Sequence, residues 1–182
     1  MKTQNTKAVS AETAHSHALF MAQAAMIAAL YIVLTFVANA FGLANYAVQV
    51  RFSEALTILP FFTPAAIPGL YIGCLLSNIL TGCALPDIVF GSLATLLGAL
   101  GTYALRKWKW CAPVCPIIAN TLIVPFVLIY GYGLIIEGFN TLQCYGFYCL
   151  TVGAGEVISC GILGMILLIT LQKYRSKIFG IH

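Results

Sequence analysis

Charged side chains are scarce in this sequence. Only 8% of the 182 residues are Asp, Glu, Lys or Arg, against roughly 25% in soluble domains, whereas 61% are hydrophobic. This scarcity excludes an ordinary soluble domain and predicts one all-α integral membrane domain. The 9 Lys and Arg residues give a formal net charge of +4. They stand in short clusters beside apolar runs, a pattern that indicates membrane topology rather than nucleic-acid binding.

Two chemical motifs are missing as well. The sequence has no GxxxxGK[ST] phosphate loop, so the chain cannot hydrolyse ATP by that device. Its 7 cysteines form no CxxC pair, so we predict no metal site and treat most of them as packing residues. The spacings of Cys111 with Cys115 and of Cys144 with Cys149 leave open a membrane thiol-redox enzyme. A disulfide on the outer face, joining Cys83 to Cys144 or Cys149, also stays open.

Long apolar runs dominate what is present. A helix of about 20 apolar residues crosses the hydrocarbon core. Clear candidates are residues 18–39, 87–105, 113–132 and 147–171. The stretch 52–85 contains Pro60, Pro64 and Pro68 and would reach about 51 Å as one helix, so we expect two short helices joined at "PFFTPAAIPG". The first run is too long for the h-region of a signal peptide and is predicted to be a membrane span.

The basic clusters indicate the number of spans. With six transmembrane helices and a cytoplasmic N-terminus, the clusters over 106–109 and 173–177 both face the cytoplasm, as the positive-inside tendency requires. Five spans would place both clusters outside. We therefore predict a six-helix bundle over residues 18–172, with cytoplasmic tails over 1–17 and 173–182.

The few acidic residues gather toward the outer side of this predicted bundle. They are Glu54, Asp87, Glu137 and Glu156, whereas the fifth acid, Glu12, lies in the predicted N-terminal tail. An ionisable group inside a membrane costs about 3 kcal/mol or more, so such groups usually face a cavity and a partner. Arg51 is the only outer basic residue in this topology, so it cannot pair with all of them. Glu156 lies roughly 13 Å inward along the last helix and is the strongest candidate for a ligand contact.

Each candidate also has a structural explanation. Glu54 stands one turn after Arg51, a spacing that permits an intrahelical ion pair. Asp87 follows a proline where a helix should begin, and an aspartate there is often only an N-cap. Asn78 and Asn120 are equally able to bond a neighbouring helix. These readings stay open beside a role in binding.

The polar residues nevertheless suit one kind of ligand. Carboxylates accept ring N–H and amine hydrogens, amides offer mixed donors and acceptors, and aromatic faces stack, as a planar, nitrogen-rich, neutral or cationic compound requires. We predict an outward-facing cavity, with residues 41–50 as its lid. The candidate binding residues are Arg51, Glu54, Asn78, Asp87, Asn120 and Glu156, with Tyr46 or Phe52 for stacking.

Small residues recur at the spacing by which membrane helices approach closely. The pairs are Ala24 with Ala28, Ala25 with Ala29, Gly69 with Gly73, and Ala94 with Gly98. We expect the two glycine-containing pairs to pack inside the bundle. For the alanines of the first helix, contact with another protein is an equal alternative.

Three blocks, RFSEAL, IPGLYIGCLLSN and LPDIVFGSLATLL, together with the alanine-rich AQAAMIAALYIVLT, resemble the QueT family of substrate-binding (S) components of energy-coupling factor (ECF) transporters. The resemblance covers most of the chain. It implies a six-helix S component in the bacterial cytoplasmic membrane that captures a queuosine precursor from outside. The implied ligand is a 7-deazaguanine such as preQ1, preQ0 or queuine.

The resemblance also implies partners rather than enzymatic activity. These partners are a transmembrane coupling subunit and two cytoplasmic ATPases. The ATPases use the ATP, and this chain is expected to need no cofactor. The family's coupling contact is an AxxxA motif in the first helix, and both alanine registers fit it. The alternatives are an S component for another vitamin-like compound, a proton-coupled small carrier, and the thiol-redox enzyme named above.

Overall fold

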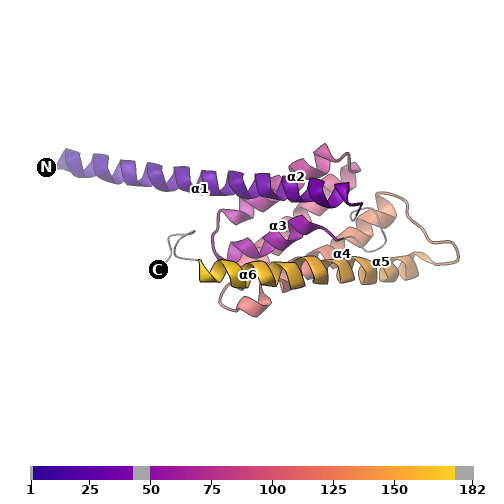
Figure 1. The fold of residues 1–182 in the computed structure, drawn as a ribbon. Helices are drawn as coiled ribbons and strands as arrows, with labels where there is room; N and C mark the ends of the chain where they lie inside the picture. Colours follow the sequence, from indigo (N-terminus) through magenta and orange to yellow (C-terminus); the bar gives the residue numbers. More distant parts are fainter. Residues whose placement is uncertain (1, 43–49, 175–182) are drawn as a thin grey trace.

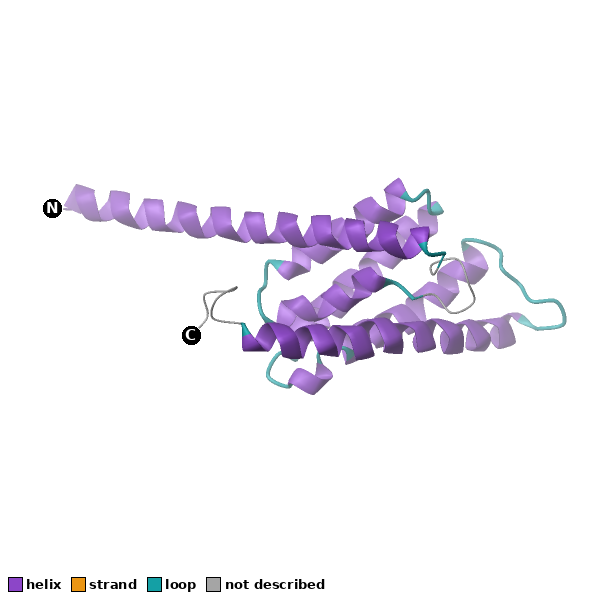
Figure 2. Ribbon diagram, viewed as in Figure 1, coloured by secondary structure: helices purple, strands orange, loops and turns teal. Residues whose placement is uncertain are grey.

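The chain folds as a bundle of helices. A computed structural model describes residues 2–42 and 50–174, and over these residues the regular structure is entirely helical (Figure 2). The elements are α1 (Lys2–Ala40), the 3-10 helix η1 (Phe52–Phe61), α2 (Ala66–Leu80), the π-helix η2 (Asp87–Gly91), α3 (Ser92–Ala104), the 3-10 turn η3 (Lys109–Cys111), α4 (Val114–Tyr130), α5 (Thr141–Glu156), the π-helix η4 (Val157–Leu163) and α6 (Gly164–Lys173).

Four helical segments are long and apolar enough to cross a membrane. They are Ala14–Ala40, Asp87–Ala104, Lys109–Tyr130 and Thr141–Lys173. The helices Phe52–Phe61 and Ala66–Leu80 are apolar but shorter. These findings confirm the predicted all-helical membrane class, whereas six crossings and cytoplasmic termini stay predictions. The start of α1 and the end of α6 lie at the same end of the bundle (Figure 1).

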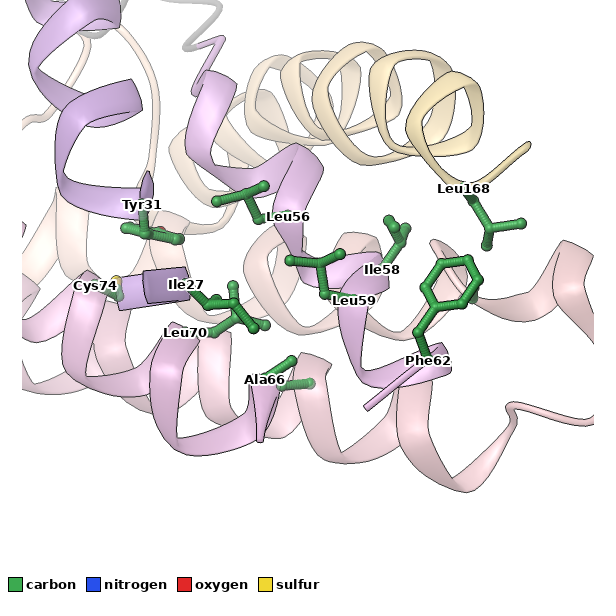
Figure 3. Packing of buried hydrophobic residues seen from close by; sticks show 12 residues of the cluster. Ile27, Tyr31, Leu56, Ile58, Leu59, Phe62, Ala66, Leu70, Cys74 and Leu168 are labelled. Carbon is green, nitrogen blue, oxygen red and sulfur yellow. The ribbon is translucent and has the colours of Figure 1, made fainter. Parts of the chain in front are cut away.

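The short helix η1 occupies the centre of the fold. It contacts α1, α2, α3, η4 and α6, and every residue from Ser53 to Pro60 is buried. Ile58 and Leu59 of η1 meet Leu70 of α2 and Leu168 of α6 in the main hydrophobic cluster (Figure 3). A helix surrounded on all sides needs apolar residues around its whole circumference, and this segment has them apart from a few polar side chains. Those exceptions matter for the site.

The predicted turn between the two short helices is confirmed. The helix η1 ends at Phe61, and α2 begins at Ala66 after four connecting residues that include Pro64. Pro60 is tolerated within η1 although it has no N–H to donate. The sharp reversal returns α2 alongside α1, and the long first helix extends well past the rest of the bundle at its N-terminal end (Figure 1).

Two helix boundaries differ from the sequence-based expectation. The last helical segment begins at Thr141 rather than at residue 147, because Asn140 and Gln143 form a reciprocal capping box with hydrogen bonds of 2.9 Å. The first helix continues back to Lys2, so the predicted tail over 1–17 is helical over the described residues. Its cytoplasmic location stays a prediction.

Close backbone contact joins α1 to α2, as the small-residue spacing predicted. A Cβ on Gly69 would lie 2.7 Å from the carbonyl oxygen of Ala24, and one on Gly73 would lie 2.8 Å from Cβ of Tyr31. Gly98 likewise faces Cα of Pro116, at 2.8 Å from its virtual Cβ. These glycines let helices approach at distances that any side chain would prevent.

Candidate ligand-binding site

Two of the three acids singled out in the sequence lie in helical turns that depart from α geometry, and the third directly precedes such a turn. Glu54 lies in the 3-10 helix η1, Asp87 opens the π-helix η2, and Glu156 is the last residue of α5, directly before the π-helix η4. Their exposed fractions are 1%, 5% and 5%. Turns of the π type are rare in helices and are frequent at functional sites.

A cavity of about 470 Å³ lies beside one of these acids. This volume is within the range of about 300–1,000 Å³ that is usual for small-molecule sites. The lining residues are Thr35, Ala38 and Asn39 of α1, Arg51, Asn78 of α2, Thr81, Cys83, Asp87 of η2, Val124 and Leu128 of α4, Tyr132 and Leu134. Charged, amide and hydroxyl groups thus meet an apolar wall, as the binding of a planar polar molecule requires.

Asp87 has one occupied and one unoccupied carboxylate oxygen. Its Oδ2 lies 3.8 Å from Nη2 of Arg51 and accepts a 3.2 Å hydrogen bond from the Tyr132 hydroxyl. Its Oδ1 is buried and has no hydrogen-bond partner among the described residues. Helical structure already begins at residue 85, and neither Asp87 carboxylate oxygen accepts a bond from a backbone N–H, so the N-cap explanation is wrong. A buried acceptor without a donor is costly, and a ligand N–H would supply the missing bond.

The neighbours of Asp87 fix its orientation. Tyr132 lies beyond the end of α4, and burial raises the pKa of its phenol to about 12, so the hydroxyl stays protonated and donates. Asn78 donates from Nδ2 to the Asp87 carbonyl oxygen at 3.3 Å. Gly91 lies one helical turn after Asp87. A Cβ at this position would lie 3.0 Å from Asp87 Oδ1 and 3.3 Å from Asn78 Nδ2. The space beside the unpartnered Asp87 Oδ1 therefore depends on the absence of a side chain at residue 91.

Deeper in the bundle lies a second group, which we call the inner polar cluster: Tyr31, Glu54, Asn120, Glu156 and Cys160. The Tyr31 hydroxyl donates to Glu54 Oε1, and Asn120 Nδ2 donates to Glu54 Oε2 at 3.2 Å. The Cys160 thiol donates to Glu156 Oε2 at 3.1 Å. Ligating atoms of Glu54, Glu156 and Cys160 all lie within 4.8 Å of one another.

The two carboxylates of the inner polar cluster are poorly compensated. Two like charges within 4.8 Å of each other would repel by about 3 kcal/mol or more at an effective dielectric constant near 20. Within residues 2–42 and 50–174 the one ion pair joins Arg51 to Asp87, not to Glu54 or Glu156. The predicted intrahelical pair between Arg51 and Glu54 is therefore not formed. The inner acids instead receive hydrogen bonds from neutral donors.

The inner polar cluster lies one helical turn from the cavity on two elements, α1 and α4. Two cluster residues show this directly: Tyr31 precedes the cavity-lining Thr35 on α1, and Asn120 precedes the cavity-lining Val124 on α4. Thr35 also donates to Ser53 Oγ at 3.0 Å, next to Glu54 in the chain. Since residues spaced four apart lie on the same face of a helix, the inner polar cluster forms a polar layer next to the cavity.

The structure thus divides the predicted binding residues into two sets. Arg51, Asn78 and Asp87 line the cavity, whereas Glu54, Asn120 and Glu156 belong to the inner polar cluster. Of the three acids predicted to line one cavity, only Asp87 is among the lining residues. Both asparagines bond a neighbouring element, as their structural explanation required.

The remaining candidates lie elsewhere. Phe52 is half-buried and is not among the cavity-lining residues. Tyr46 and most of the predicted lid over 41–50 fall outside the described residues. Glu137 is exposed, as expected for a residue in a glycine-flanked loop.

Sequence reasoning missed Tyr31 and Cys160 and assigned no specific role to Tyr132. A hydroxyl in the middle of an apolar run was the available signal for Tyr31, which is 1% exposed. Cys160 stands four residues after Glu156, so helical spacing alone brings its thiol to the acid. Tyr132 follows the end of α4, and only the tertiary fold brings it to Asp87.

The alanine pairs of α1 are separated by the structure. Ala24 and Ala28 pack against Gly69 and Gly73 of α2, whereas Ala25 and Ala29 are exposed. Exposed Met21, Met26, Leu30 and Val33 surround the latter pair. Only one of the two registers is therefore accessible to another protein in this fold.

All seven cysteines are free, and none forms the disulfide that their spacing left open. Cys83 lines the cavity, whereas Cys144 is buried with its sulfur accepting from the Ile136 amide at 3.4 Å.

Comparison with known proteins adds to this geometry. The family model of the QueT transporters matches residues 21–173. The chain belongs to the QueT transporter family. It is also similar to the "Queuosine precursor transporter QueT" of Lactococcus lactis subsp. cremoris (strain MG1363), with 36% identity over 86 residues. That alignment spans 47% of this chain and 50% of the relative, about half the length of each. No solved structure matches the chain.

Membership of the QueT family confirms the resemblance drawn from the RFSEAL, IPGLYIGCLLSN and LPDIVFGSLATLL blocks. The matched range contains every candidate binding residue as well as α1 from Met21. It also fits the composition, because a transporter family accounts for four apolar helices in one chain. This QueT family member is a multi-pass membrane protein of a transporter class rather than a typical enzyme.

Proposed function

We propose that this chain captures a queuosine precursor, a 7-deazaguanine such as preQ1, preQ0 or queuine, from outside the cytoplasmic membrane. It would act as the S component of an ECF importer, with both termini in the cytoplasm. Family membership and the name of the Lactococcus relative support the substrate class. The observation that carries the proposal is the 470 Å³ cavity with a buried, unpartnered carboxylate oxygen on Asp87.

The cavity chemistry agrees with a deazaguanine. Such a ring carries N–H and amino donors on its pyrimidine edge, and Asp87 Oδ1 is an acceptor that lacks a donor. Asn78 supplies an amide and Arg51 a fixed cationic group on the same wall. Val124 and Leu128 of α4 form an apolar surface for the ring face.

Direct titration tests this substrate assignment. The purified chain in lipid nanodiscs would be titrated with preQ1, preQ0, queuine, guanine and an unrelated vitamin. We expect binding of at least one deazaguanine and weaker binding of its Asp87→Asn variant. Glu137→Gln, an exposed acid outside the cavity, is the matched control. Tight binding of the vitamin alone would reject the substrate class while leaving a transporter of the same fold.

The energy source is tested separately. The ECF proposal requires a coupling subunit and two ATPases, because the sequence contains no phosphate loop of its own. Vesicles containing all four proteins should accumulate ligand only while ATP is hydrolysed. Accumulation by this chain alone, driven by a proton gradient, would replace the ECF proposal with a proton-coupled carrier.

The accessible alanine register supports one face of α1 as the proposed coupling contact. Ala25 and Ala29 are exposed on α1, so a bulky residue there should block assembly without disturbing the fold. We expect Ala25→Leu to retain ligand binding and lose co-purification with the coupling subunit. Ala28→Leu, which faces Gly73, should instead destabilise the chain itself. Normal assembly of the Ala25→Leu variant would exclude this face.

A further inference from the structure

The arrangement of charges in the buried site distinguishes between ligands of the same ring system. Three acids, Glu54, Asp87 and Glu156, are each at least nine-tenths buried, and one basic side chain, Arg51, accompanies them. Arg51 contacts Asp87 at 3.8 Å, which makes the cavity wall close to neutral. The inner polar cluster keeps two carboxylates that no described cation contacts.

The neutral donors around the inner acids do not cancel this charge. Both oxygens of Glu54 accept hydrogen bonds, from Tyr31 and from Asn120. Such bonds stabilise a carboxylate but leave its charge in place. Glu156 accepts a hydrogen bond from the Cys160 thiol, which is a weak donor, and its other hydrogen-bonding neighbour is the neutral amide of Asn120. Glu156 is thus the acid that gains most from a cationic partner.

The inner polar cluster also lies where a ligand arm can be directed. It is one helical turn from the cavity on α1 and on α4, while the unpartnered Asp87 Oδ1 belongs to the cavity wall. A planar ring held by Asp87 would therefore present its opposite edge, or a substituent on it, toward the inner layer. A primary ammonium has three donors and one positive charge, so it suits two carboxylates whose oxygens lie within 4.8 Å.

We infer that the Glu54–Glu156 pair selects a deazaguanine carrying a cationic aminomethyl group over neutral deazaguanines of the same size. Asp87 reads an uncharged N–H of the ring, and the inner pair receives the ammonium. This inference rests on the proposed function, because it assumes a deazaguanine ligand. It goes further by assigning different parts of that ligand to the two acidic sets.

A matched pair of ligands tests the inference. The 7-aminomethyl and 7-hydroxymethyl deazaguanines differ by one charge at nearly constant size. In nanodiscs at pH 7, we expect the full-length protein to bind the aminomethyl compound at least about tenfold more tightly, the scale of one charge-assisted hydrogen bond. Glu156→Gln should bring the ratio of the two affinities near one, because it weakens the binding of the aminomethyl compound. Glu137→Gln should preserve the ratio.

Other variants separate binding from selection. Asp87→Asn should weaken both compounds by a similar factor and leave their ratio unchanged. Glu156→Asp retains the charge and should retain the preference for the aminomethyl compound. It serves as the second variant if Glu156→Gln fails to fold. Equal wild-type affinities for the two compounds would overturn the inference, and so would an unchanged ratio in Glu156→Gln. A different result would also overturn the inference: Zn²⁺ displaces the aminomethyl compound, and the protein shows no preference between the two organic ligands. That result would assign the Glu54–Glu156 pair to metal binding instead. If folded wild-type protein binds neither compound, the proposed function itself fails.

Discussion

Replacing Gly91 with alanine should weaken ligand binding without lowering stability, a combination that few substitutions produce. The added Cβ would lie 3.0 Å from Asp87 Oδ1 and 3.3 Å from Asn78 Nδ2. Both contacts are tighter than side chains normally accept, so these two polar groups must move by a few tenths of an ångström. The backbone poses no obstacle, because Gly91 has φ −63° and ψ −44°, which alanine adopts readily.

The size of both effects follows from the contacts. Alanine is favoured over glycine within helices by about 1 kcal/mol, which offsets the cost of moving two side-chain ends. Binding has no such compensation, because the unpartnered Asp87 Oδ1 is the acceptor that we propose for the ligand. Loss of a hydrogen bond to a charged group costs about 1.5–3 kcal/mol, and a partial loss corresponds to roughly tenfold in affinity.

The assay pairs ligand titration with thermal unfolding of the same nanodisc preparation. Gly146→Ala in α5 is the matched control, since no atom lies within 4 Å of its added Cβ. The control should retain wild-type affinity and equal or exceed wild-type stability. Wild-type affinity in Gly91→Ala would refute the role of Asp87 Oδ1 in binding. A parallel fall in stability and affinity would show instead that the helix itself is disturbed.

Three further predictions concern the bundle and the cavity rim. Tyr31→Phe removes the hydroxyl donor to buried Glu54, so it should lower the melting temperature and weaken binding, measured by thermal unfolding and titration; no change in either would show that another donor replaces it. Gly73→Ala places a Cβ 2.8 Å from that of Tyr31 and should cost about 1–3 kcal/mol by overpacking, seen as a lower melting temperature, whereas wild-type stability would contradict the close contact of α1 with α2. Cys83 lines the cavity, so ligand should slow its alkylation relative to Cys149, followed by mass spectrometry, and equal rates with and without ligand would place the ligand elsewhere.

Much of the architecture was predictable because it depends on local sequence. Apolar runs long enough to span a membrane, the turn around Pro64 and the close approach at Gly69 and Gly73 all follow from neighbouring residues. The start of the last helical segment was wrong because its capping box, Asn140 with Gln143, lies in a polar stretch that hydropathy does not identify. Local capping chemistry decided that boundary.

The sequence by itself determined that this is a helical membrane protein with a few costly acids, because hydropathy and charge placement act along the chain. Tertiary packing alone decided which partner each acid takes. Arg51 contacts Asp87 instead of nearby Glu54, and Glu54 receives Asn120 from a helix 66 residues away in the chain. Pairing across such distances depends on how helices cross, and crossing is set by the summed contacts of many side chains around η1 rather than by any single motif.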